Sequence, residues 1–160
     1  MGAIYRVYID TSVIGGCLEA PEHAEWSLKL MDAFDHGEMV AILSEITLGE
    51  LKDAPPEVKK ILDRPGLVEA ERFSVDDEVR KLAKAYHEEK AVGIKHWADA
   101  QHIALATIHR ADILVSWNFR HIVNLNRIRI YNAVNLKLGY PILEIRNPKE
   151  VAPNEDEEKI

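Results

Sequence analysis

Short apolar runs alternate with amphipathic segments along most of the chain. The runs are rich in β-branched and aromatic residues, which favour strands, and they cover residues 4–9, 39–43, 67–73, 113–116 and 142–145. Between them lie segments whose apolar residues recur every three or four positions, which predicts helices. These segments cover residues 24–34, 45–53, 56–63, 96–109 and 128–138, with a further helix after a capping-box motif at 74–77 and a single turn at 118–123.

This alternation of strands and helices predicts a parallel sheet with helices on both of its faces. We therefore expect an α/β fold, a three-layer α/β/α sandwich with a small parallel sheet, over residues 1–146. No internal repeat or linker divides the chain, and its 160 residues suit one domain. Residues 147–160 contain five acids and two lysines, and we expect this acidic tail to be disordered.

The composition indicates where the protein works. With 47% hydrophobic and 29% charged residues, the chain can build a core and remain soluble. Its apolar runs are too short for a membrane-spanning helix, and its start has no secretory signal segment. The single cysteine, Cys17, cannot form an internal disulfide. These features predict a cytoplasmic protein without a membrane partner.

The distribution of charge is uneven. A net charge of −7 argues against general affinity for nucleic acids. Residues 113–143, however, contain no Asp or Glu and four basic side chains, which belong to Arg120, Arg127, Arg129 and Lys137. This stretch is either a locally basic surface or an ordinary solvated one, and composition leaves both open.

Four oxygen-bearing side chains are predicted to meet at one edge of the sheet. Asp10 directly follows the first strand, and Asn118 follows the strand at 113–116. Asp99 lies in the first turn of the helix that leads into that strand, and Glu50 lies on the helix after the strand at 39–43. Since sites in open α/β sheets form outside the carboxyl ends of the strands, these side chains are expected to converge there.

The convergence of carboxylates needs a compensating charge, because they repel one another and resist burial. Mg²⁺ and Mn²⁺ both prefer oxygen ligands, and Mg²⁺ is held by one or two carboxylates together with waters and phosphates. Asp10 and Asp99 are therefore candidate ligands for either ion. The other interpretation of Asp10 is structural, as a helix N-cap or a turn residue.

Four segments together resemble the PIN-domain family of metal-dependent ribonucleases, which includes the VapC-type toxins of toxin–antitoxin pairs. The segments are "YIDTSVIGG", "SEITLGELKDA", "HWADAQHIALA" and "ADILVSWNFRHIV". The resemblance covers about residues 4–145, and it lies in the order and spacing of the motifs more than in any one of them. It implies a small α/β/α sandwich with a parallel sheet, in agreement with the independent interpretation of the pattern.

The resemblance also assigns roles to single residues. Asp10, Glu50 and Asp99 take the positions of the family's first three acids. The resemblance also makes the hydroxyl residues that accompany the acids candidates for substrate binding, and these are Thr11, Ser12 and Ser116. Asn118 stands where the fourth acid is expected, and this departure puts a second metal ion in more doubt than a first, because an amide oxygen carries no charge.

The resemblance implies a metal-dependent endoribonuclease that leaves a 5′-phosphate and a 3′-hydroxyl. It also implies a homodimer and a small antitoxin protein as partner. The alternative is a PIN-like RNA-binding or scaffold domain in which Asn118 has removed catalysis. Arg120 and His121 are candidate contacts to the phosphates of RNA, with solvated surface as the other interpretation.

Several other candidates are less suited to a metal site. Glu45 lies five residues before Glu50, about 140° around a helix, so the two cannot face one ion. Asp112 begins the strand that Asn118 follows, about 20 Å from the site. Four histidines have no zinc-binding spacing: His96, His102, His109 and His121. Two tryptophans are candidates for base stacking or for packing, Trp97 and Trp117.

Overall fold

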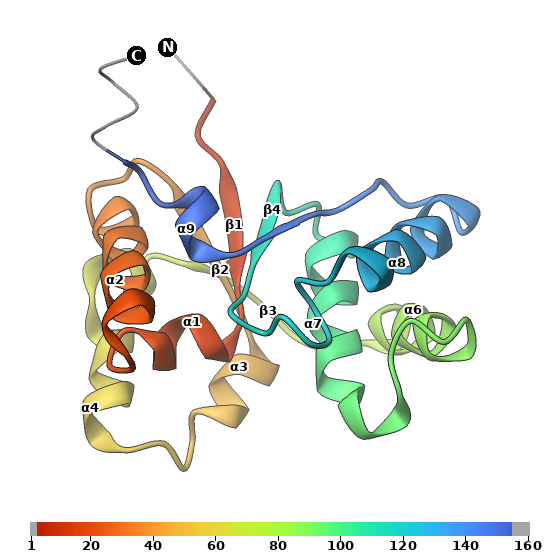
Figure 1. The fold of residues 1–160 in the computed structure, drawn as a ribbon, viewed down its shortest axis with the longest axis horizontal. Helices are drawn as coiled ribbons and strands as arrows, with labels where there is room; N and C mark the ends of the chain where they lie inside the picture. The colour runs from red at the N-terminus through yellow and green to blue at the C-terminus, as the bar shows by residue number, and fades with distance from the viewer. Residues whose placement is uncertain (1–2, 155–160) are drawn as a thin grey trace.

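The computed structural model describes residues 3–154 of the chain (Figure 1). Within this range five strands form one sheet in which every neighbouring pair is parallel. The strands are β1 Arg6–Ile9, β2 Val40–Ser44, β3 Glu71–Phe73, β4 Ile113–Val115 and β5 Glu144–Arg146. Their order across the sheet is β3-β2-β1-β4-β5, so the chain winds in one direction from β1 to β3 and in the other from β4 to β5.

Each face of the sheet has its own apolar core, because successive strand residues point to opposite faces. One core receives the strand residues Tyr8, Ile42, Leu114 and Ile145. The other receives Val7, Ile9, Ala41, Leu43 and Val115. Burial on both faces explains why the strands form continuous apolar runs in the sequence.

Helices cover both faces of the sheet (Figure 1). The core on one side is closed by α6 Asp77–Glu88, α7 Trp97–Ile108 and α8 Leu125–Lys137, with the short turn η2 Ile94–His96 before α7. The other is closed by α1 Thr11–Gly16, α2 Pro21–Asp35, α4 Pro56–Lys59, η1 Lys60–Asp63, α5 Pro65–Val68 and α9 Pro148–Val151. The short helix α3 Glu45–Glu50 follows β2 at the carboxyl edge. The three-layer α/β/α architecture is therefore confirmed.

Several local predictions differ from the structure. The strand expected at 67–73 is shorter, because Pro65 opens α5 and the buried Leu67 belongs to that helix. The helix expected from residue 128 begins at Leu125, where Asn124 accepts a hydrogen bond from the Arg127 amide and caps α8. The N-cap of α6 is Asp76, two residues after the predicted start of the capping box. The polar cap residues, more than apolar spacing, set these boundaries.

The acidic tail is ordered in its first part, contrary to expectation. Asn147 caps α9 by accepting from the Glu150 amide, and α9 packs against α2. Ala152 is buried with the core on that side of the sheet. Residues 155–160 of the tail lie outside the described range. Across the described residues, no helix has both the length and the apolar character needed to span a membrane.

The reversal of winding direction falls between β1 and β4, which are neighbours in the sheet. At such a switch point the connections leave their strands toward opposite faces, which opens a crevice outside the carboxyl ends. Asp10 follows β1 and Ser116 follows β4 at this point. The fold therefore brings the predicted residues to the position where open α/β sheets bind ligands.

Candidate functional site

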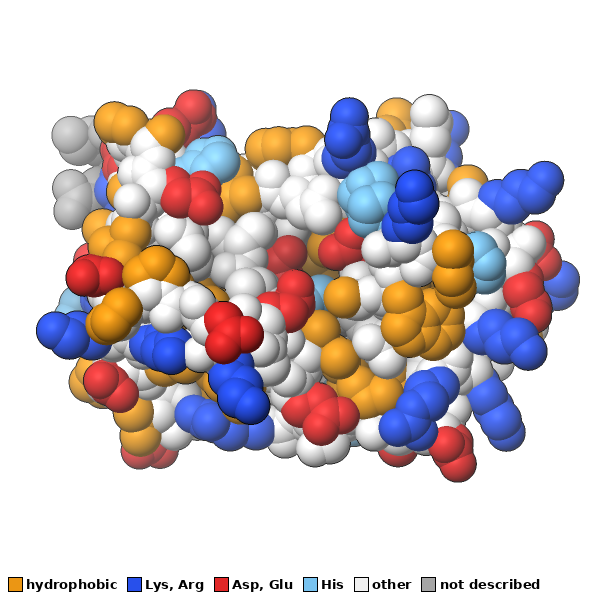
Figure 2. Space-filling model, turned by 90° about the horizontal axis from the view of Figure 1, so that it is seen from below, with side chains coloured by type: hydrophobic (Ala, Val, Ile, Leu, Met, Phe, Trp, Pro, Cys, Tyr) orange, Lys and Arg blue, Asp and Glu red, His pale blue; other side chains and the backbone are white. Residues whose placement is uncertain are grey.

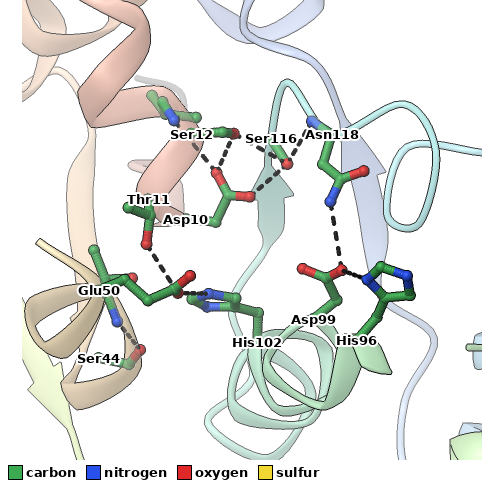
Figure 3. A network of polar contacts seen from close by, with 12 residues as sticks. Asp10, Thr11, Ser12, Ser44, Glu50, His96, Asp99, His102, Ser116 and Asn118 are labelled. Carbon is green, nitrogen blue, oxygen red and sulfur yellow. Dashed lines mark hydrogen bonds and ion pairs between the residues drawn. The ribbon is translucent and has the colours of Figure 1, made fainter. Parts of the chain in front are cut away.

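Acidic side chains gather around a hollow on the face of the molecule that carries the strands' carboxyl ends (Figure 2). Figure 3 shows that the side chains beneath this hollow come from both helical layers. Asp10, Ser12 and Glu50 come from the segments after β1 and β2, and Asp99 and Asn118 come from α7 and the segment after β4. The structure thus brings together the four residues that the sequence predicted to converge.

Asp10 is held by three hydrogen bonds and is only 5% exposed. Its Oδ1 accepts from the Ser12 hydroxyl at 2.6 Å and from the Val13 amide at 3.3 Å. Its Oδ2 accepts from the Ser116 hydroxyl at 2.5 Å. The bond from Val13 makes Asp10 the N-cap of α1, as its structural interpretation predicted.

Ser12 and Ser116 bracket Asp10 and connect it to the backbone after β4. The Ser12 hydroxyl accepts from the Trp117 amide at 2.9 Å, and the Ser116 hydroxyl accepts from the Asn118 amide at 2.9 Å. Each serine hydrogen is directed at Asp10, so both hydroxyls are engaged within the protein. A role for these hydroxyls in substrate binding stays a prediction.

Glu50 is tied to both helical layers through one of its oxygens. Oε1 accepts from the Thr11 hydroxyl at 3.0 Å and bonds His102 Nε2 at 2.9 Å. Burial alone would raise the pKa of Glu50, but the hydrogen bonds from His102 and Thr11 outweigh this effect and lower the pKa. Oε2 has no hydrogen-bond partner among the described residues, so it is free to contact a ligand.

Asp99 lies in the first turn of α7, across the hollow from Asp10 (Figure 3). Its Oδ2 lies 3.5 Å from Asn118 Nδ2 and 3.8 Å from His96 Nδ1. Both are weak contacts by distance. Oδ1 has no hydrogen-bond partner within the described part of the chain, so Asp99, like Glu50, keeps one oxygen free.

The orientation of the Asn118 amide follows from the donors around it. Its Oδ1 accepts from the backbone amides of Arg120 at 3.1 Å and His121 at 2.9 Å. Since backbone amides can only donate, the oxygen must face them and Nδ2 must face Asp99. Asn118 therefore shapes the turn after β4 with its oxygen and presents a hydrogen-bond donor, not an acceptor, to the hollow.

The surroundings of Asp10 and Asp99 disfavour the ionised forms of both carboxyls. Burial raises the pKa of Asp10, although the hydroxyls of Ser116 and Ser12 act in the opposite direction. Burial also raises the pKa of Asp99, with a further contribution from the nearby Glu50 carboxylate. A cation at this position would relieve both effects, because an opposite charge favours the ionised form of a carboxyl.

The donor set fits a partly hydrated Mg²⁺ or Mn²⁺ ion better than a metal enclosed by protein ligands. In the part of the chain that the structure describes, no group of three or more His, Cys, Asp or Glu side chains has the arrangement needed to hold a metal ion. Mg²⁺ typically keeps several waters and uses one or two carboxylates. The carboxylates of Asp10 and Asp99 would suit that mode, and the Glu50 carboxylate lies near that of Asp99.

The basic residues of the acid-free stretch have different surroundings. Arg127 donates to the Ala91 carbonyl at 2.7 Å, and Arg129 lines a groove between α6 and α8 beside Glu89. Arg120 is exposed in the turn that follows Asn118. After burial and His96, the charges of Arg127 and Arg120 also lower the pKa of His121, so both of these arginines lie near that residue.

His121 stacks on His96 beside Asp99, with ring centroids 3.6 Å apart. Burial and the neighbouring His96 lower the pKa of His121, which favours its neutral form near neutral pH. Its Nδ1 is buried and has no hydrogen-bond partner within residues 3–154. The prediction that His121 contacts phosphate is not decided by these contacts.

The two acids set aside in the sequence have structural partners. Glu45 accepts from the Val75 amide at 2.6 Å, and Asp112 accepts from the Arg6 amide at 2.7 Å. Trp117 packs, since its indole donates to Ser27 and its ring stacks on His23. These contacts agree with the structural interpretation of all three residues.

Sequence reasoning missed the buried partners of Glu50. The sequence pattern suggests His102 only as a zinc ligand, and it places Tyr8 in an apolar strand without a role for its hydroxyl. Residues on either side of His102 in α7 are buried, namely Ala100, Ile103 and Ala104. A polar ring among such residues was the signal that a buried acceptor or donor must lie opposite.

Comparison with known proteins assigns no family: no family model and no curated protein matches the chain. The geometry of the site is therefore the basis on which its function is proposed.

Proposed function

We propose that the protein is a metal-dependent endoribonuclease whose active site is the hollow outside β1 and β4. The observation that carries the proposal is the meeting of three carboxylates, Asp10, Glu50 and Asp99, at the switch point of a parallel sheet. Two of them, Asp10 and Asp99, would suit a partly hydrated divalent cation, and the switch point is where open α/β sheets bind their ligands. The resemblance of the sequence motifs to PIN-domain ribonucleases supports the same conclusion.

Each residue of the site has a distinct part in this proposal. Asp10 and Asp99 hold Mg²⁺ or Mn²⁺, and Asp10 is fixed for this by its two serine donors. A bound divalent cation supplies a water of lowered pKa and stabilises charge that develops on the phosphate. Glu50 would orient an attacking water through its free oxygen, and Asn118 would steady Asp99 through its amide nitrogen.

The substrate proposed is RNA, held by phosphate contacts without strong sequence preference. Arg120 and His121 lie two and three residues after Asn118 and are the proposed contacts, because their backbone amides bond the side chain of Asn118 at the edge of the site. Cleavage is expected to leave a 5′-phosphate and a 3′-hydroxyl. A homodimer and a small antitoxin partner belong to the same proposal and rest on the resemblance alone.

A second candidate function is RNA binding or scaffolding without cleavage. The observation in its favour is the amide of Asn118, which faces Asp99 with a donor and engages its oxygen in the turn. A site with this donor has one anionic ligand fewer than four acids would provide. Cleavage of RNA that requires a divalent metal distinguishes the two candidates.

The test is a thermal-shift titration with Mn²⁺ combined with an RNA cleavage assay. A ligand that binds only the folded state raises its melting temperature. We expect Mn²⁺ to raise the melting temperature of the wild type and Asp10→Asn with Asp99→Asn to abolish both this shift and cleavage. The control is Asp63→Asn with Asp77→Asn, which removes two charges from exposed positions away from the site. A full Mn²⁺ shift in the site variant would show the assignment to be wrong.

A further inference from the structure

A chain of hydrogen bonds runs from Glu50 away from the hollow and into the core. His102 Nε2 bonds Glu50 Oε1 at 2.9 Å, and His102 Nδ1 bonds the Tyr8 hydroxyl at 2.6 Å. The Tyr8 hydroxyl bonds Ser44 Oγ at 2.7 Å, and Ser44 Oγ accepts from the Thr47 amide at 3.4 Å. Tyr8, Ser44 and Thr47 are fully buried and His102 is 2% exposed, so the chain is shielded from solvent.

The donors and acceptors in this series of hydrogen bonds determine the direction in which each hydrogen is donated. A carboxylate only accepts, so His102 Nε2 must carry a hydrogen. With Nδ1 unprotonated, Tyr8 donates to His102 and Ser44 donates to Tyr8, so both hydroxyl hydrogens have an acceptor. With Nδ1 protonated, Tyr8 would have to donate to Ser44, because the nearby buried hydroxyl of Thr47 makes no hydrogen bond to the described residues. The hydrogen of Ser44 would then have no acceptor at bonding distance among these residues. A buried hydroxyl without an acceptor is costly.

We propose that His102 is a positioning residue that fixes Glu50 from behind, in a neutral tautomer with the hydrogen on Nε2 that Tyr8 and Ser44 select. The inference rests on the proposed function for the role of Glu50 in the site. Because Thr11 and His102 both bond Oε1, Oε2 is directed into the space between Asp10 and Asp99 (Figure 3).

Without this support Glu50 would be poorly held. It is the last residue of the six-residue helix α3, and its side chain is 43% exposed. Ordering a free glutamate side chain costs conformational entropy. A carboxylate that is already ordered before a ligand arrives avoids that cost at the moment of binding.

Two substitutions of His102 separate its two bonds. The amide of Gln reaches about as far as Nε2, so His102→Gln keeps a donor for Glu50. The shorter Asn reaches about as far as Nδ1, so His102→Asn keeps a partner for Tyr8 and loses the bond to Glu50. A merely structural role predicts the same loss for both variants, whereas positioning predicts partial rescue by Gln.

A matched pair of tyrosines separates positioning from core packing. Tyr8→Phe removes the hydroxyl that selects the tautomer of His102. Tyr86→Phe removes an equally buried hydroxyl from the same core, but that hydroxyl bonds Thr107 and Asn135 and does not contact the Glu50 chain. Both variants are expected to lower the melting temperature, and only Tyr8→Phe should disturb Glu50.

The first two readouts are made on metal-free protein and do not depend on activity. Nitrogen-15 NMR of the imidazole is expected to show His102 protonated on Nε2 alone, in the wild type and in Tyr86→Phe. Carbon-13 relaxation of the Glu50 side chain is expected to show order in these two proteins, a small loss in His102→Gln and a large one in His102→Asn. A His102 protonated on Nδ1, or a Glu50 equally ordered in all variants, overturns the proposal.

The third readout is the affinity for Mn²⁺ from the thermal-shift titration. Loss of a residue that orients a ligand typically lowers metal affinity by about 10-fold to 100-fold. We expect a loss of about 10-fold for His102→Asn, a smaller loss for His102→Gln and none for Tyr86→Phe. Equal losses in all three would overturn the positioning role. Absence of any Mn²⁺ shift in the wild type would instead refute the proposed function, while the two NMR readouts still decide the positioning of Glu50.

Discussion

Asp10 has the structural role that the sequence offered for it, and this role is compatible with the proposed metal role. One oxygen caps α1 through the Val13 amide, and both oxygens accept a serine hydroxyl. A carboxylate has about four acceptor positions, so these bonds leave room for a further contact. The N-cap bond fixes the rotamer of Asp10 at the end of β1, and it thereby places a negative charge at the switch point of the sheet.

Asn118→Asp tests the position where the chain departs from the PIN pattern. One oxygen of the new carboxylate is expected to keep the backbone bonds to Arg120 and His121, while the other replaces the donor that faces Asp99. Without metal the variant should lose about 1–3 kcal/mol of unfolding free energy, because a hydrogen bond becomes a repulsion between like charges. With Mn²⁺ the loss should shrink or reverse.

The measurement is the melting temperature with and without Mn²⁺. The control is Asn124→Asp, since Asn124 also accepts a backbone hydrogen bond as a cap and Asp is an equally good N-cap. It should change stability little in either condition. Equal destabilisation of Asn118→Asp with and without metal would mean that Asn118 only shapes the turn.

At the scale of elements, the sequence predicted all five strands and most helices, and it missed the short helices α1, α5 and α9. Buried strands leave continuous apolar runs, such as residues 39–43 for β2, because both faces of the sheet are covered. The helix α1 was missed, since its six residues include Gly15 and Gly16 and only one turn of apolar spacing. Its start depends on the Asp10 cap, and one polar residue is too common a signal to predict a helix.

Substitution by Ala is expected to change the unfolding free energy in opposite directions at Gly15 and Gly16 of α1. A Cβ on Gly16 would meet Trp117 Nε1 at 2.8 Å and Ser27 Oγ at 2.9 Å, whereas one on Gly15 would meet only Glu19 at 3.7 Å. Gly16→Ala should therefore cost roughly 1–3 kcal/mol, as overpacking does. Gly15→Ala should gain up to about 1 kcal/mol, because Ala favours a helix. Urea denaturation measures both, and equal effects would contradict the close contact of Trp117.

An ion pair between β1 and β3 makes stability depend on pH. Arg6 reaches across β2 to Glu71, with N···O distances of 2.7 and 2.9 Å, and also donates to carbonyls at the end of α7. The hydrogen bond from Arg6 lowers the pKa of Glu71, with its charge as a further cause. The folded state therefore favours ionised Glu71, and this stabilisation is present above the ordinary glutamate pKa and lost as pH falls through the lowered one.

Glu71→Gln should lower the unfolding free energy at neutral pH by about 1 kcal/mol or less, because both side chains are about one-third exposed. The difference from the wild type should vanish at a pH below the lowered pKa of Glu71. Urea denaturation across this pH range measures it. The control is Glu57→Gln, because Glu57 forms no ion pair with the described residues. Its difference from the wild type should not depend on pH. A difference that persists in acid would contradict the ion pair.

At the scale of the molecule, the convergence of the acids could be predicted because parallel topology alone fixes which edge carries them. Asp10, Asp99 and Asn118 were placed by counting strands and helices, without any side-chain contact. The links behind them could not be predicted, because His102 meets Glu50 and Tyr8 only once α7 packs on β1 and α3. Such contacts depend on helix rotation and register, which no local pattern fixes.

The whole-molecule charge distribution makes a prediction for RNA binding. Salt weakens binding in proportion to the phosphates that a protein neutralises. Arg120→Ala should reduce the salt slope for a short single-stranded RNA, measured in EDTA, by roughly 0.7–1. Arg129→Ala should leave the slope unchanged, because Arg129 lies in the groove between α6 and α8 beside Glu89. Equal effects of the two substitutions would mean that the RNA does not follow the acidic hollow.

The sheet keeps the two apolar cores apart, yet the polar site draws on both sides of it. Thr11 and Glu50 lie at the ends of helices on one side, and Asp99 and His102 lie on α7 on the other. A ligand that bridges these groups adds to the bonds of Glu50, which already joins Thr11 on one side to His102 on the other. Its binding should therefore slow amide hydrogen exchange in α1 and in α7 together. A large-to-small substitution in one of the two cores should instead speed exchange in the helices of that layer alone.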